Sequence, residues 1–289
     1  MRPRLLLVAL IVPIAAWAPA APGLAQGINT NVALAVAKGE GIWRSQLRWM
    51  RASEDPSPLD READLLVAPQ VLVYGVTPRL TAFGILPILA HRKVEGGGRT
   101  LVRDEAVGDF TLLGRYTFFQ DDYAPLSTRR VALLAGMKFP SGADRFGTPS
   151  FDPIAGIVGT WAADRHELDA DLVYTLTTER HDIETGDVVR YDVAYRYRLW
   201  PDRFRGRRMQ LNGLLELNGA WTDETRIDGR TQRATGGHVV FLSPGLQFIT
   251  SRLIVEASLQ LPVVQDLNGP QLETDFIGVL STRVPFVFP

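Results

Sequence analysis

The sequence predicts an all-β protein: a closed antiparallel transmembrane β-barrel of about 12 strands with up-and-down topology. Three observations predict this fold class. Apolar and polar residues alternate with a period of two in stretch after stretch, separated by breaks rich in Gly, Pro and Asp. The breaks themselves alternate between short and long. Hydrophobic residues make up 46% of the 289 positions, yet after the first two dozen no apolar run reaches the roughly 18 residues that a membrane-spanning helix needs.

The N-terminal residues are typical of a secretory signal peptide. Arg2 and Arg4 precede an apolar stretch that ends in small residues, and we expect cleavage before Gln26. An uncleaved anchor helix is the alternative, but prolines interrupt the segment and its apolar core is short for a bilayer. The chain is therefore expected to consist of a signal peptide at 1–25 and an outer-membrane β-barrel at 26–289.

The alternating stretches have the lengths of membrane strands. A tilted transmembrane strand needs about 9–11 residues, and most of the stretches are close to this length. The expected strands are 41–51, 64–75, 79–91, 108–119, 130–140, 151–162, 166–178, 188–200, 209–222, 238–249, 252–264 and 274–286.

The connections predict which end of the barrel faces the cell surface. Outer-membrane barrels have short turns on the periplasmic side and longer loops outside. An even number of strands then leaves both termini in the periplasm. The shorter connections are 75–78, 120–129, 163–165, 201–208 and 250–251, and the longer ones are 52–63, 92–107, 141–150, 179–187, 223–237 and 265–273.

The two faces of the strands favour a membrane barrel over a water-soluble one. In strand 188–200, Tyr191 and Val193 share one face, whereas Asp192 and Arg196 share the other. A membrane barrel is apolar outside and can be polar within, so we expect the charged face to line the lumen. The candidate lumen-lining residues are Arg44, Arg48, Asp109, Arg115, Lys138, Glu167, Asp169, Asp171, Arg190, Asp192, Arg196, Arg198, Glu216, Arg252, Glu256 and Arg283.

Strands 166–178 and 188–200 are expected to form a hairpin. With a loop at 179–187, Asp171 would face Arg196 and Asp169 would face Arg198. These two ion pairs would narrow the periplasmic half of the lumen. About 12 strands lined by long charged side chains predict a narrow passage, because barrels of eight strands are filled by side chains and those of sixteen leave a wide channel.

The sequence holds no recognisable catalytic, cofactor or metal site. It has no cysteine, and its four histidines lack other ligands at metal-binding spacing. The run Gly96–Gly98 lacks the Lys-Ser/Thr ending of a phosphate loop. We therefore expect no catalytic residue, no cofactor, no metal and no enzymatic activity. The net charge of −1 gives no basic field for nucleic acid, so no nucleic-acid partner is expected.

Several strand-end motifs resemble those of one known family. They are Tyr-Gly-Val-Thr-Pro-Arg-Leu at 74–80, Gly-Asp-Phe-Thr at 108–111, Lys-Phe-Pro-Ser-Gly-Ala-Asp at 138–144, Arg-Tyr-Asp at 190–192 and Tyr-Arg-Leu-Trp-Pro at 197–201. Together they resemble the MetA-pathway of phenol degradation family, a group of predicted outer-membrane transporter barrels. The resemblance implies the fold and supplies no catalytic residues. The chain departs from other barrels of this membrane at its end, where Pro289 follows the usual terminal aromatic residue.

These observations predict a porin-like channel or transporter in the outer membrane of a Gram-negative bacterium. The resemblance implies that its solutes are small aromatic or hydrophobic compounds. The expected partners are outer-membrane lipid, a small-molecule solute and, during biogenesis, the barrel-assembly machinery. Two alternatives remain open: a structural or surface-binding outer-membrane barrel without transport and, less favoured, an outer-membrane lipid hydrolase with a Ser–His pair.

Overall fold

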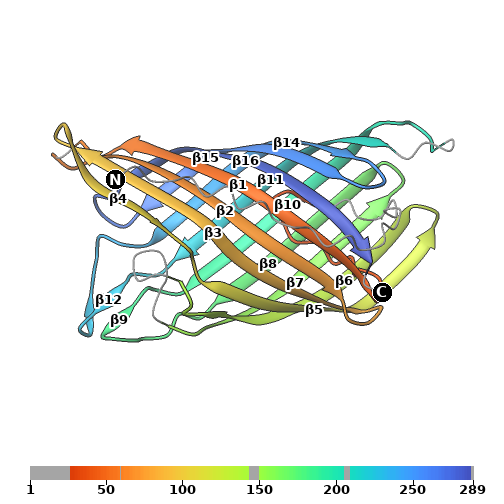
Figure 1. Cartoon of the computed structure of the whole chain (residues 1–289), viewed down its shortest axis with the longest axis horizontal. Helices are drawn as coiled ribbons and strands as arrows, with labels where there is room; N and C mark the ends of the chain where they lie inside the picture. The colour runs from red at the N-terminus through yellow and green to blue at the C-terminus, as the bar shows by residue number, and fades with distance from the viewer. Residues whose placement is uncertain (1–26, 59, 143–149, 205–208, 288–289) are drawn as a thin grey trace, which may run out of the picture.

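The chain folds into a closed β-barrel (Figure 1). The computed structural model describes residues 27–58, 60–142, 150–204 and 209–287. Within these ranges twelve antiparallel strands form the wall, so the predicted fold class is confirmed. The wall strands are β1 (Glu40–Glu54), β2 (Glu62–Gly75), β3 (Leu80–Gly96), β5 (Phe110–Ala124), β6 (Ser127–Phe139), β7 (Asp152–Ala163), β8 (His166–Thr175), β10 (Val188–Trp200), β11 (Gln210–Thr222), β14 (Gly237–Ile249), β15 (Ile254–Leu267) and β16 (Glu273–Val287).

The barrel closes between its first and last strands. β1 pairs with β2 on one side and with β16 on the other, from Glu40 opposite Val287 to Glu54 opposite Glu273. Closure leaves no wall strand with a free edge, which a bilayer requires because its core offers backbone groups no hydrogen-bonding partners. Across the described ranges no helix is long and apolar enough to span a membrane.

Short strands also occur where the sequence predicted only loops. β4 (Arg99–Ala106) extends β3 as a hairpin within the segment 92–107. β9 (Ile183–Glu184), β12 (Arg226–Ile227) and β13 (Arg230–Thr231) form a separate small sheet from two long loops. The link expected at 120–129 is instead a tight turn, because β5 runs to Ala124 and β6 begins at Ser127.

The wall strands turn apolar side chains outward and polar ones inward. On β11, Leu215 is 48% exposed on the outer surface, whereas its neighbour Glu216 is 1% exposed within the lumen. The inward positions Asn212, Gln247 and Glu256 are fully buried as well. A water-soluble barrel would show the reverse pattern, so the burial agrees with a barrel surrounded by lipid.

The hairpin of β8 and β10 has a different register from the one the sequence predicted. Asp171 lies opposite Asp192 rather than Arg196, a displacement of four residues along β10, and Asp169 lies opposite Ala194 rather than Arg198. The predicted Asp171–Arg196 and Asp169–Arg198 pairs were therefore wrong. β8 ends at Thr175, and the loop that follows is longer than expected because the Asp187 carboxylate holds the Thr177 N–H at 2.8 Å. Since the displacement is even, the charged residues keep their face.

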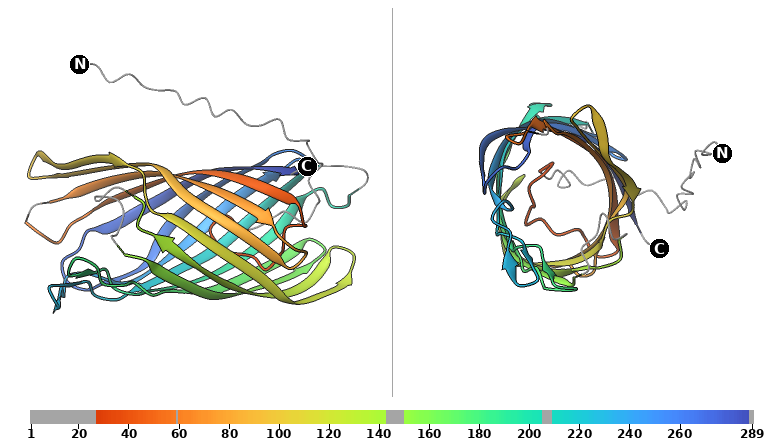
Figure 2. Two further views of the ribbon diagram at one scale, coloured as in Figure 1. Left: turned by 60° about the horizontal axis from the view of Figure 1, so that its bottom comes forward. Right: turned by 90° about the vertical axis from the view of Figure 1, so that its left-hand side faces the viewer.

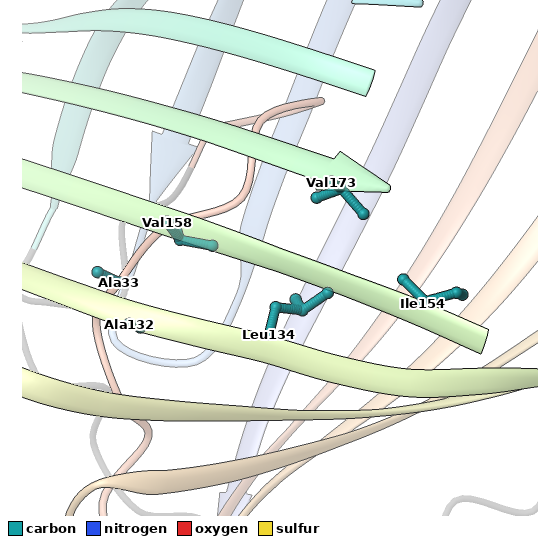
Figure 3. Packing of buried hydrophobic residues seen from close by; sticks show 6 residues of the cluster. All are labelled: Ala33, Ala132, Leu134, Ile154, Val158 and Val173. Carbon is teal, nitrogen blue, oxygen red and sulfur yellow. The ribbon is translucent and has the colours of Figure 1, made fainter. Parts of the chain in front are cut away.

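The segment between the predicted signal peptide and β1 lies inside the barrel. Residues Gly27–Gly39 enter the lumen as an extended chain, visible in red within the ring of strands (Figure 2). Ala33 packs against Ala132 and Val158 on the inner wall, in a small apolar cluster completed by Leu134, Ile154 and Val173 (Figure 3). The sequence assigned this segment no role, and we call it the plug.

Candidate functional site

The plug is anchored at its N-terminal end by one carboxylate. Glu216 of β11 accepts hydrogen bonds from the backbone N–H groups of Ile28 (2.7 Å) and Asn29 (2.9 Å), and from the Asn29 side-chain amide (2.7 Å). Gly27 permits this approach, since a Cβ there would lie 3.0 Å from the Glu216 carboxylate and 2.9 Å from the Thr30 carbonyl. Hydrogen bonds to a charged acceptor are among the stronger ones in proteins, so Glu216 is the principal anchor of the plug.

Further along the plug, wall side chains take the place of a neighbouring strand. Asp171 accepts the Asn31 N–H at 2.7 Å, Thr160 accepts the Ala33 N–H at 2.9 Å, and Thr81 accepts the Val36 N–H at 3.1 Å. A buried backbone N–H must have a partner. Because the partners here are side chains, the plug can be held without joining the barrel ladder.

Arginines of the wall satisfy the plug carbonyls. Arg44 donates to the Ile28 carbonyl at 2.5 Å, Arg283 donates to the Gly27 carbonyl at 2.8 Å, and Arg115 donates to the Leu34 carbonyl. Arg44 and Arg283 are in turn bridged by the buried Glu256 carboxylate, at 3.4 and 2.9 Å. The plug therefore rests in a cage of alternating charges contributed by strands far apart in the sequence.

The end of the plug passes close to the first short turn. A Cβ on Gly75 would overlap the carbonyl oxygens of Val36 and Ala37. Gly75 belongs to the Tyr-Gly-Val-Thr-Pro-Arg-Leu motif, so the glycine in that motif has a steric role where the plug meets β1 and β2.

The structure places the predicted lumen residues other than Arg252 in three groups. Those in contact with the plug, directly or through one neighbour, are Arg44, Arg48, Arg115, Asp169, Asp171, Glu216, Glu256 and Arg283. Asp109 and Lys138 approach each other at the long-loop end, at 3.7 Å. The others on the inward faces of β8 and β10 are Glu167, Arg190, Asp192, Arg196 and Arg198.

Arg252 does not lie on a strand. It occupies the exposed turn between β14 and β15, because β15 begins only at Ile254. Uncharged polar residues complete the cage, namely Thr81, Thr160, Asn212, Asn218, Ser243, Gln247 and Gln260. Alternation along the strands places Asn212, Asn218 and Gln260 on the inward face, but the candidate lumen residues were restricted to charged ones. Thr81, Thr160, Ser243 and Gln247 were missed, and their only signal was position on the inward face of a strand.

Between the plug and the short turns lies a cavity of about 250 Å³, here called the short-turn cavity. The plug contributes Leu34 to its lining, and the wall contributes Arg130, Arg196 and Arg198. An adjoining compartment of about 630 Å³ shares Arg198 and Phe204 with it and adds Asp202 and Arg203. The lumen therefore holds the plug and, at the short-turn end, two adjoining cavities. Among the described residues no group of three or more His, Asp or Glu side chains is arranged to hold a metal ion.

An apolar outer wall, a polar lumen, short turns at one end and long loops at the other define an outer-membrane β-barrel of the channel-like class. The chain belongs to the family described as "Putative MetA-pathway of phenol degradation", whose model matches residues 64–263. The predicted family is thereby confirmed.

Solved structures share the fold. The COG4313 outer membrane channel from Pseudomonas putida F1 superimposes with a TM-score of 0.68 at 15% identity, covering 88% of this chain and 98% of that one. The β domain of the Bordetella autotransporter BrkA gives 0.53 at 10% identity, covering 86% of this chain and 99% of that one. None of the curated proteins matches the sequence.

Proposed function

We propose that this barrel is an outer-membrane channel for small aromatic or hydrophobic compounds and that the plug controls its opening. The observation that carries the proposal is the way the plug is held. From Ile28 to Val36 its backbone N–H groups are bonded to side chains of the wall, such as those of Glu216 and Asp171. A backbone bond to a strand occurs at the end of the plug, where the Gly39 N–H donates to the Gly75 carbonyl of β2 at 3.0 Å. Water can replace side-chain contacts one by one, whereas a segment paired in the sheet would be fixed. The solute class is supported by the family to which the chain belongs.

The proposal includes the route of the protein to its membrane. Residues 1–25 act as a cleaved signal peptide in a Gram-negative cell, although this segment lies outside the described residues. Outer-membrane lipid is a partner of the folded barrel, and the barrel-assembly machinery is a partner during biogenesis. The short turns, with the short-turn cavity, then face the periplasm, and the small sheet of β9, β12 and β13 faces the cell surface.

Transport is tested by comparing the protein with a variant lacking residues 27–38. Both are reconstituted in liposomes, and swelling is followed with aromatic and non-aromatic solutes of matched size. We expect slow swelling for the complete chain and faster swelling for the deletion variant, with heat-modifiable gel mobility showing that both are folded. If neither protein conducts ions or admits any solute, the barrel is a structural or surface-binding protein. Lipid turnover by the purified protein would instead support the hydrolase.

A further inference from the structure

The short-turn cavity holds arginines whose acidic partners are unevenly buried. The Arg198 side chain is 5% exposed, but its partner Asp164, at 2.7 Å, is 69% exposed. Arg130 is 17% exposed and its partner Asp122 is 50% exposed. A cation fixed in the wall and an anion free in water make a weak pair, because the exposed carboxylate is well solvated on its own. The acidic partners can therefore be exchanged for another carboxylate at little cost.

Arg196 shows the opposite arrangement in the same cavity. Its side chain is 12% exposed, and its partner Glu167 is 6% exposed. Glu167 accepts hydrogen bonds from both Nε and Nη2 of Arg196, so this pair is closed. The same two-point geometry holds Asp55 on Arg61, at 2.8 and 2.9 Å. Side-on binding through Nε and Nη2 is a geometry in which a guanidinium grips a carboxylate most specifically.

Arg198 uses only one of the two donors of this geometry. Its Nη2 donates to Asp164, while its Nε is buried and has no hydrogen-bond partner. The position of Arg198 is set by its backbone, since its N–H donates to the Arg165 carbonyl at 2.9 Å and its carbonyl accepts from Arg165 Nε at 3.0 Å. The Phe204 ring lies 4.6 Å from the guanidinium carbon. A buried donor without a partner is costly, and the Arg198 side chain that carries it lines a cavity of about 250 Å³.

We propose that the short-turn cavity is a binding site for a small carboxylate with an apolar body. The ligand carboxylate displaces Asp164, the Arg198 side chain turns so that its buried Nε reaches the cavity, and the carboxylate binds side-on through Nε and Nη2. Its body lies against the apolar lining, to which Leu34, Leu126 and Phe204 belong. The site lies on the pathway of the proposed channel, but binding to it does not depend on transport.

Benzoate is the probe, and calorimetry on the complete mature protein in detergent is the measurement. We expect saturable binding of benzoate that weakens with salt, and none of benzyl alcohol, which has the same ring without the charge. Arg198→Gln should weaken benzoate binding by about tenfold or more, because the charged two-point contact is lost. Arg198→Lys should also weaken it, since an ammonium keeps the charge without the fork.

Asp164→Asn should have the opposite effect, tightening benzoate binding several-fold by removing the competing carboxylate. Asp164 has a positive φ of 50° in its turn, a conformation that Asn tolerates as well as Asp does. The matched control is Arg129→Gln. Arg129 lies at the short-turn end of the barrel, near the start of β6, but does not line the cavity.

The proposal is overturned if Asp164→Asn leaves binding unchanged or weakens it, or if Arg129→Gln weakens binding as much as Arg198→Gln. It is also overturned if benzyl alcohol binds as tightly as benzoate. If benzoate binds with the expected pattern but the barrel admits no solute, the binding site is supported and the channel function is refuted. If solutes pass but benzoate does not bind, the channel function is supported and the binding site is refuted.

Discussion

Replacing Glu216 with Gln should loosen the plug while leaving the barrel intact. One carboxylate oxygen accepts the Ile28 N–H and the other accepts two N–H groups of Asn29. The amide can keep one acceptor oxygen, so at least one plug N–H must face another donor. Losing a charge-assisted bond costs about 1.5–3 kcal/mol, and the remaining bonds weaken because their acceptor becomes neutral. The expected cost is therefore about 3 kcal/mol, which raises the population of released plug roughly 100-fold.

Single-channel recordings in planar bilayers measure this population directly, as the fraction of time spent in a higher-conductance state. The matched control is Glu167→Gln, which neutralises another buried lumen carboxylate whose partner is Arg196 and not the plug. We expect frequent openings in Glu216→Gln and wild-type behaviour in Glu167→Gln. Equal opening in the two variants, or none in either, would refute the role of Glu216 as the anchor.

Three further predictions concern the barrel wall, the end of the plug beside Gly75 and a surface loop. Leu215→Arg, on the outward face at the middle of β11, should lower the free energy of unfolding in lipid by about 2–4 kcal/mol. Leu199→Arg, near the end of β10, should lower it far less. Equal losses in urea titrations would contradict the assigned outward face. Gly75→Ala should displace the plug and raise conductance, whereas Gly84→Ala, with 3.4 Å to the nearest side-chain atom, should not. The Arg61 guanidinium holds the pKa of the Asp55 carboxyl well below its usual range. The contact therefore stabilises the loop fully at pH values above the unfolded pKa of about 3.9, and this stabilisation is lost as pH falls through the lower pKa of the folded state. Asp55→Asn should accordingly speed tryptic cleavage at Arg61 near neutral pH, and an unchanged rate would show that the contact does not order the loop.

The strand faces, the strand number and the family were all predictable from the sequence. Alternation with a period of two is a local property, so β8, β10, β11 and β15 could be assigned an apolar and a charged face without knowing their neighbours. Alternating long and short connections followed from one-sided access to the cell surface. These features require no knowledge of which residues meet across the barrel.

Only the tertiary structure decided the register between strands, the position of the plug in the lumen and the partner of each charged side chain. The pairing of β8 with β10 depends on how the loop before β10 closes, and the Asp187 contacts that close it leave no local periodic signal. Glu216 and Ile28 meet although 188 residues separate them. In the sequence the plug resembles any short apolar stretch, because no local pattern shows that side chains of the wall hold it. The sequence likewise does not show that Arg198 uses Nη2 and leaves Nε without a partner, because this depends on which acid the folded barrel brings near it. Local alternation therefore determines what each residue faces, whereas closure of the barrel determines what it touches.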